Sequence, residues 1–212
     1  MSEENGVIYR ISGPVVTAMG ISPRMYEVVR VGDEGLMGEV IELHGDQSVI
    51  QVYEETSGIS PGEPVIRTGQ TLSVQLGPGL LTKIYDGIQR PLPELEQTMG
   101  VFITRGVDAD GLDLEKIWDF AATAKAGDEV APGAVLGTVQ ETETIEHRVM
   151  VPPGMSGVIK SIKSGEFNVT QTVCTLEDGT EIAMMQKWPV RTPRPFVQKY
   201  APDTPLITGQ RI

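Results

Sequence analysis

The stretch LMGEVIELHGDQSVIQVY, Leu36–Tyr53, contains two short apolar runs joined by a turn. The runs are Leu36–Leu43 and Gln47–Tyr53, and both are rich in β-branched residues, as strands are. Between them, Gly45 and Asp46 have the composition of a tight turn, because glycine adopts the positive φ that two-residue hairpin turns require. The stretch therefore predicts a β-hairpin.

Similar short runs, each bounded by turn residues, lie on both sides of this hairpin. They are Val7–Ile11, Pro14–Met19, Tyr26–Val31 and Thr71–Gln75. Strands this short and closely spaced need to hide their edges, and closure into a small barrel removes edges altogether. We therefore expect a six-stranded antiparallel barrel over residues 1–75. None of its residues suggests catalysis, and small barrels usually bind partners through their surfaces, so we expect it to be an interaction domain.

Residues 76–112 break this strand pattern and are expected to form a connection. Within it, Pro93–Met99 has proline in the first turn and is followed by Gly100, which is the asymmetry typical of a short helix. Glu94 and Glu96 lie early in this run, where the helix dipole favours acidic side chains. We expect a mainly β protein with short helical connections.

A second β domain is expected over residues 113–188, and residues 189–212 are expected to lie outside it. Its predicted strands are Ala134–Val139, His147–Val151, Gly157–Ile162, Gln171–Leu176 and Glu181–Met185. The segment AGDEVAPGAVLGTVQETET and the later VMVPPGMSGVIKSI resemble the biotinyl and lipoyl carrier domains, which are flattened barrels of two sheets. A carrier holds its cofactor on a lysine at a hairpin tip, whereas Glu141–Glu146 contains no lysine and Lys160 and Lys163 lie on a later strand. The resemblance therefore implies the fold and not the carrier function.

Composition excludes several classes of function. The 212 residues include 17 basic and 29 acidic side chains, giving a net charge of −12, so nucleic acids and anionic membrane surfaces are not expected partners. The single cysteine excludes an internal disulfide framework. The N-terminal MSEENGVIYR has no apolar segment of a signal peptide, and no run approaches the roughly 18 apolar residues of a membrane span. We expect a cytoplasmic protein.

No catalytic, cofactor-binding or metal-binding residue is expected. The sequence has no G-x-x-x-x-G-K-[ST] loop and no H-E-x-x-H, and His44, His147 and Cys174 lack metal-ligand spacing. His44, beside a hairpin turn, is expected to be exposed, and Cys174, on an alternating apolar run, to be a buried inert thiol. Trp118 and Trp188 are expected in a core or at a domain interface.

A set of longer motifs resembles one family in order, from near residue 6 to the last residue. These motifs are SGPVV (12–16), MYEVV (25–29), GLMGEV (35–40), IQVYEETSG (50–58), LGPGLL (76–81), IYDGIQRPL (84–92), MVPPG (150–154), WPVR (188–191) and PLITGQRI (205–212). The chain is thereby similar to the catalytic A subunit of the archaeal and vacuolar-type rotary ATPases.

This resemblance implies a division of labour. The barrel would join a crown of alternating A and B subunits, while the inserted domain would form an outward bulge near the peripheral stalk, and the complex would include a central stalk. Residues 76–112 and 189–212 would belong to the nucleotide-binding domain. ATP synthesis or hydrolysis, coupled to proton or sodium transport, would need ATP, Mg²⁺ and the later P-loop, so this chain alone is expected to be inactive.

We therefore expect the N-terminal part of a longer subunit, bound to the cell membrane only through its complex. The alternative is a self-standing, non-catalytic assembly or interaction module that binds an A/B-type ring. The two differ in whether the native protein continues past Ile212.

Overall fold

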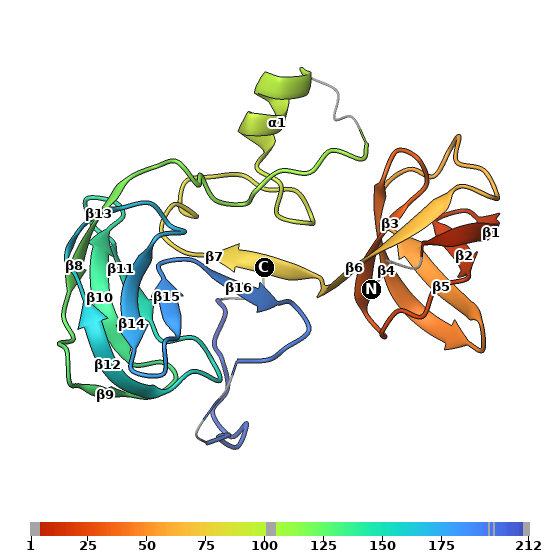
Figure 1. Ribbon diagram of the computed structural model, residues 1–212. Helices are drawn as coiled ribbons and strands as arrows, with labels where there is room; N and C mark the ends of the chain where they lie inside the picture. The colour runs from red at the N-terminus through yellow and green to blue at the C-terminus, as the bar shows by residue number, and fades with distance from the viewer. Residues whose placement is uncertain (1–4, 101–104, 195, 197, 210–212) are drawn as a thin grey trace.

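Figure 1 shows the computed structural model of the chain, which describes residues 5–100, 105–194, 196 and 198–209. A closed barrel forms one end and two four-stranded sheets form the other, with a two-stranded ribbon between them (Figure 1). The mainly β architecture predicted from the sequence is confirmed.

The barrel closes through six antiparallel strands in the spatial order β1-β2-β5-β4-β3-β6. Their bounds are β1 (Gly6–Ser12), β2 (Val15–Met19), β3 (Glu27–Val31), β4 (Leu36–His44), β5 (Gln47–Val52) and β6 (Pro64–Thr71). Alternate side chains, including Val16, Val29 and Ile50, fill the interior and are fully buried. The barrel closes where Gly6 and Val7 of β1 pair with Val65 and Pro64 of β6. The predicted six-stranded antiparallel barrel is therefore confirmed.

The predicted position of its sixth strand is wrong. The barrel is closed by Pro64–Thr71, whereas Thr71–Gln75 runs out of the barrel into another strand. Pro64 stands at the first position of β6, where a missing N–H is tolerated in a strand. Gly69, with φ of 70°, lies near the end of β6, so proline and glycine make the run resemble a turn.

The second β region is built from two four-stranded sheets, in the orders β11-β10-β8-β13 and β15-β14-β12-β9. Their bounds are β8 (Trp118–Ala122), β9 (Glu129–Val130), β10 (Val135–Gln140), β11 (Glu146–Met150), β12 (Gly157–Ile162), β13 (Gly165–Phe167), β14 (Thr172–Leu176) and β15 (Glu181–Ala183). Phe120, Leu136 and Ile159 lie in the core between them. The five predicted strands are confirmed, whereas β8, β9 and β13 were not predicted. β9 and β13 are runs of two or three residues, which show no periodicity.

The connection contains helix α1 (Leu92–Met99), which confirms the helix predicted over 93–99. Within it, Leu95 is buried. Gly100 ends the helix with φ of 79°, and its N–H donates to the Glu96 carbonyl at 2.8 Å.

The ribbon pairs two segments that are far apart in the sequence. It consists of β7 (Ser73–Leu76) and β16 (Gln186–Pro189), which are antiparallel. It lies between the barrel and the two sheets (Figure 1). The segments through which the chain enters and leaves the second β region therefore lie side by side.

Candidate interaction site at the barrel junction

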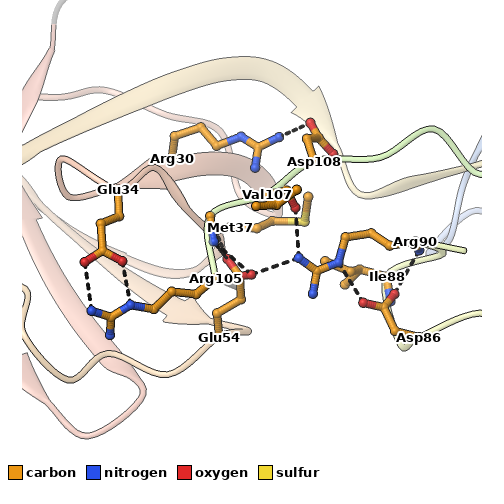
Figure 2. Close-up of polar contacts among 11 residues, drawn as sticks. Arg30, Glu34, Met37, Glu54, Asp86, Ile88, Arg90, Arg105, Val107 and Asp108 are labelled. Atoms are coloured by element: carbon orange, nitrogen blue, oxygen red, sulfur yellow. Dashed lines mark hydrogen bonds and ion pairs between the residues drawn. The ribbon is translucent and has the colours of Figure 1, made fainter. Parts of the chain in front are cut away.

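Arg90 forms the centre of the junction between the barrel and the connection. Its Nη1 lies 3.0 Å from Glu54 Oε1, just after β5, and its Nε lies 2.7 Å from Asp86 Oδ2 (Figure 2). Nη1 also donates to the Val107 carbonyl at 2.8 Å. Burial opposes the charge on Arg90, but Asp86 and Glu54 outweigh it and raise the pKa of the guanidinium. One permanently charged side chain thus joins three segments.

Asp86 stabilises the turn that positions Arg90. Its Oδ1 accepts hydrogen bonds from the backbone N–H groups of Ile88, at 3.0 Å, and Arg90, at 2.8 Å. Burial raises the pKa of Asp86, but these bonds and the guanidinium outweigh burial and hold that pKa below its ordinary value. In the same turn, Gln89 has φ of 66° and its amide bonds both the N–H and the C=O of Gln75 in β7, at 2.6 and 2.7 Å. The turn is therefore held against barrel and ribbon together.

The loop after α1 lies on the turn between β3 and β4. Arg105 donates to Glu34 at 2.8 Å, and Arg30 pairs with Asp108 (Figure 2). Gly106 has φ of 72°, and its N–H lies 3.2 Å from both carboxylate oxygens of Glu54. A Cβ at this position would collide with the carbonyl oxygen of Glu34. Glycine is thus required for the loop to approach the barrel.

A second attachment to the barrel comes from Arg191, just after β16. Its Nε lies 2.9 Å from Glu39 Oε1, its Nη2 bonds Oε2, and its guanidinium lies over the ring of Tyr26. Glu39 is only 2% exposed, and the hydrogen bond from Arg191 lowers the pKa of its carboxyl despite burial. Tyr53 donates to Glu39 at 3.0 Å, and burial together with this carboxylate raises the pKa of Tyr53 to about 12.

The residues that the sequence analysis singled out lie away from this junction or at its edge. His44 is exposed and lies 2.8 Å from Glu42, Cys174 is buried, and Trp118 lies in the core of the second β region, all as predicted. Trp188 lies on the ribbon, half-buried, with its Nε1 donating to the Thr192 carbonyl at 2.8 Å. Lys160, on β12, is exposed.

The sequence did not predict the two ion-pair clusters, one around Arg90 and one around Arg191. Five of their charged residues lie inside the motifs quoted above, namely Glu39, Glu54, Asp86, Arg90 and Arg191, whereas Arg30, Glu34, Arg105 and Asp108 do not. Glu39 and Arg191, for example, are 152 positions apart, and no local pattern links residues at that separation. The available clue was the presence of charged residues inside glycine-rich apolar motifs, where a charge needs a partner if it is buried.

The ribbon separates two cavities. The opposite faces of its two strands carry Gln75 and Lys187 on one side and Leu76, Gln186 and Trp188 on the other. The first set lines a polar cavity of about 350 Å³ against the barrel, with Arg30 and Asp108. The second lines a groove of about 280 Å³ against β11, here called the β11 groove. Its remaining lining residues are Pro132, Gly133, His147, Arg148, Val149, Met150, Val151, Pro153, Met184 and Arg194.

Within the described ranges, no group of three or more His, Cys, Asp or Glu residues is placed to hold a metal ion. Among the same residues, no helix has the length and apolar character needed to cross a membrane.

Comparison with known proteins finds a matching family model for each of the two β regions. The model for the ATP synthase alpha/beta family, beta-barrel domain, matches residues 8–69, and the model for the ATPsynthase alpha/beta subunit barrel-sandwich domain matches residues 109–191. The second match agrees with the two packed sheets seen in that region.

Curated relatives match over almost the full chain. The A subunit of the A-type ATP synthase of Methanosarcina barkeri is 61% identical over 210 residues, that of Methanoculleus marisnigri 64% over 208, and that of Natronomonas pharaonis 57% over 210. These matches cover 98% or 99% of this chain but only 35% or 36% of the relatives. The chain therefore spans about a third of the length of the curated relatives that it matches.

Proposed function

Because the chain belongs to the ATP synthase alpha/beta family and corresponds to the N-terminal part of the A subunit of A-type ATP synthases, we propose that it assembles the catalytic ring of such an enzyme. The observation that carries the proposal is the 61% identity to the Methanosarcina barkeri A subunit over 99% of the chain. The barrel packs beside B subunits in an alternating hexamer, and the barrel-sandwich domain faces the peripheral stalk. The complex, with its central stalk, lies on the cytoplasmic side of the membrane.

The intact subunit would bind ATP and Mg²⁺ and couple ATP synthesis or hydrolysis to proton or sodium transport. Phosphoryl transfer depends on positioning and on charge stabilisation of the phosphates. We assign this chemistry to a nucleotide-binding domain, and to this chain a non-catalytic role.

An exposed apolar seam on the barrel is the surface best suited to a neighbouring subunit. Val7 and Tyr9 on β1 are 48% and 58% exposed, and Ile66 on the adjacent β6 is 37% exposed. Apolar side chains that are exposed together on neighbouring strands favour a protein interface. The ion pairs at Arg90 and Arg191 support this role, because they fix the barrel that carries the seam to the segments that follow it.

Assembly tests the proposal directly. The chain is mixed with the B subunit from the same source and the complexes are measured by native mass spectrometry. We expect mixed complexes with the wild-type chain and loss of most of them with Tyr9→Asp. The matched control is Ile145→Asp, which changes a similarly exposed apolar residue at the β10–β11 turn. Wild-type levels of assembly with Tyr9→Asp would place the interface elsewhere, and no assembly with the B subunit at all would refute ring assembly.

Catalysis is tested on the same preparation. With ATP and Mg²⁺, the chain alone is expected to release no phosphate above buffer and to bind nucleotide weakly, whereas a measurable turnover would refute the non-catalytic role. The alternative, a self-standing interaction module, is distinguished by the intact mass of the native protein, which is expected to be far above 23.0 kDa.

A further inference from the structure

The β11 groove lies along a strand edge that has no neighbouring strand among the described residues. β11 is the last strand in its sheet, with β10 on its other side. On the β10 side, Val151 donates to the Ala134 carbonyl and accepts from the Gly133 N–H, both at 2.9 Å. Backbone groups alternate between the two sides of a strand, so those of Arg148 and Met150 face the open edge. The Met150 carbonyl indeed accepts from Gln186 Nε2, across the groove, at 3.2 Å.

The floor of the groove is apolar and adaptable. Leu76 and Trp188 line it from the ribbon, while Met150 and Met184 line it from the second β region. Methionine side chains are flexible and fit apolar groups of different shapes. The groove can therefore hold one large apolar side chain of a partner.

The rim of the groove is basic although the chain is strongly acidic. The lining includes Arg148 and Arg194 but no Asp or Glu, in a chain of net charge −12. Across the described part of the chain, neither arginine pairs with a carboxylate, and Arg194 lies 5.6 Å from the centroid of the Trp188 ring. Burial lowers the pKa of the third basic residue, His147, so the positive charge near neutral pH comes from the arginines.

We propose that the β11 groove binds an extended, acidic peptide segment of another protein, which adds as a strand to the edge of β11. Arg148 and Met150 are two residues apart and therefore point to the same face. An added strand places two of its own residues, also two apart, beside them. The residue beside Arg148 is Asp or Glu, and the residue beside Met150 is large and apolar. The partner thus carries an acid–x–apolar motif.

The open backbone edge favours a peptide over a small amphipathic carboxylate. Both would use the arginines and the apolar floor, but only a peptide satisfies the N–H and C=O of Arg148. The inference rests on the groove alone and goes beyond ring assembly, so its failure would leave the proposed function standing.

Capped peptides with an Asp-x-Phe centre in a Thr-rich background are the probe. They are titrated into the full 212-residue chain while tryptophan fluorescence is followed, since Trp188 lines the groove and Trp118 is buried elsewhere. We expect saturable binding with a weak, micromolar to submillimolar Kd. Arg148→Glu should weaken it about tenfold, because an attractive pair becomes a repulsive one. Lys160→Glu makes the same charge change on an exposed strand residue outside the groove and should leave the affinity unchanged.

A peptide of opposite charge tests whether the Arg148→Glu variant is still folded. The Lys-x-Phe peptide should bind Arg148→Glu more tightly than it binds the wild-type chain. N-methylation of the peptide amides, one at a time, should abolish binding at the amide that bonds the Arg148 carbonyl.

Three results would overturn the proposal. They are the absence of saturable binding by any peptide, equal binding of Asp-x-Phe and Asn-x-Ala peptides, and no effect of N-methylation at any position. Octanoate serves as the small-molecule arm: if it displaces the peptide at equal affinity, the groove takes apolar carboxylates and not strands.

Discussion

Arg90 illustrates how a buried charge depends on its partners. Its side chain is 9% exposed and that of Glu54 is 8% exposed. A buried pair adds little net stability compared with an apolar pair of the same shape, but removing one partner leaves the other charge buried and uncompensated. Arg90→Ala should therefore lower the free energy of unfolding by about 3 kcal/mol, measured by urea denaturation.

Exposed Arg10, on β1, provides the control for this variant. Arg10→Ala should change the free energy of unfolding by less than about 0.5 kcal/mol, as surface substitutions do. An equally small effect of Arg90→Ala would mean that water replaces the guanidinium at Glu54 and Asp86.

The lowered pKa of Glu39 should make the stability of the protein depend on pH. Arg191 holds the pKa of this carboxyl below the ordinary value of 4.5. Below pH 4.5 the unfolded chain therefore takes up a proton at Glu39 before the folded chain does, and stability falls as the pH falls towards the folded pKa. Glu39→Gln should flatten this part of the acid unfolding curve while lowering stability at pH 7. The curve is measured by circular dichroism from pH 7 to pH 3, and an unchanged slope would contradict the assignment.

The strands show which features of the fold a sequence can predict. The β4–β5 hairpin and the strands β14 and β15 were predictable because turn residues and apolar runs lie next to one another. The β7–β16 ribbon was not, because Ser73–Leu76 finds its partner more than a hundred residues later. Local patterns carry no information about pairing over such a distance, and the same reason hid the Arg191–Glu39 contact.

Gly137 in β10 shows how packing restricts one position in a strand. A Cβ there would overlap the ring of Phe120 and the carbonyl of Ala121 on the neighbouring β8. Gly137→Ala should therefore destabilise the second β region by about 1–3 kcal/mol, the usual effect of overpacking a core. Thermal unfolding measures the effect. Gly87→Ala is the control, because no atom beyond its two chain neighbours lies within 4 Å of its added Cβ. The prediction is wrong if both variants behave alike.

The barrel is joined to the other elements by one covalent link and two sets of ion pairs. The link is the chain from Thr71 to Ser73. One set of ion pairs centres on Arg90 and includes Arg30–Asp108 and Arg105–Glu34, and the other centres on Arg191. Arg90 or Arg191 alone should keep the barrel in place, whereas Arg90→Ala combined with Arg191→Ala should release it. The pairs that remain, Arg30–Asp108 and Arg105–Glu34, each have an exposed acidic partner and contribute little. The radius of gyration from small-angle X-ray scattering should then increase in the double variant and stay near the wild-type value in each single variant.

Hydrogen exchange separates this release from unfolding. In the double variant, the amides of the turn around Ile88 and Arg90 should exchange faster, while those of β4 and β5 keep their protection. Loss of protection in the barrel strands as well would mean that the barrel itself has unfolded.

The attachment at Arg191 has a mechanical consequence. A body held by a single flexible link can swing and twist, so a force applied to it is absorbed at the link. Arg90 and Arg191 hold the barrel through segments that reach it before and after the second β region. Each added contact removes a direction in which the barrel can turn. A force applied to the barrel is therefore transmitted to the ribbon and to the segment that follows it.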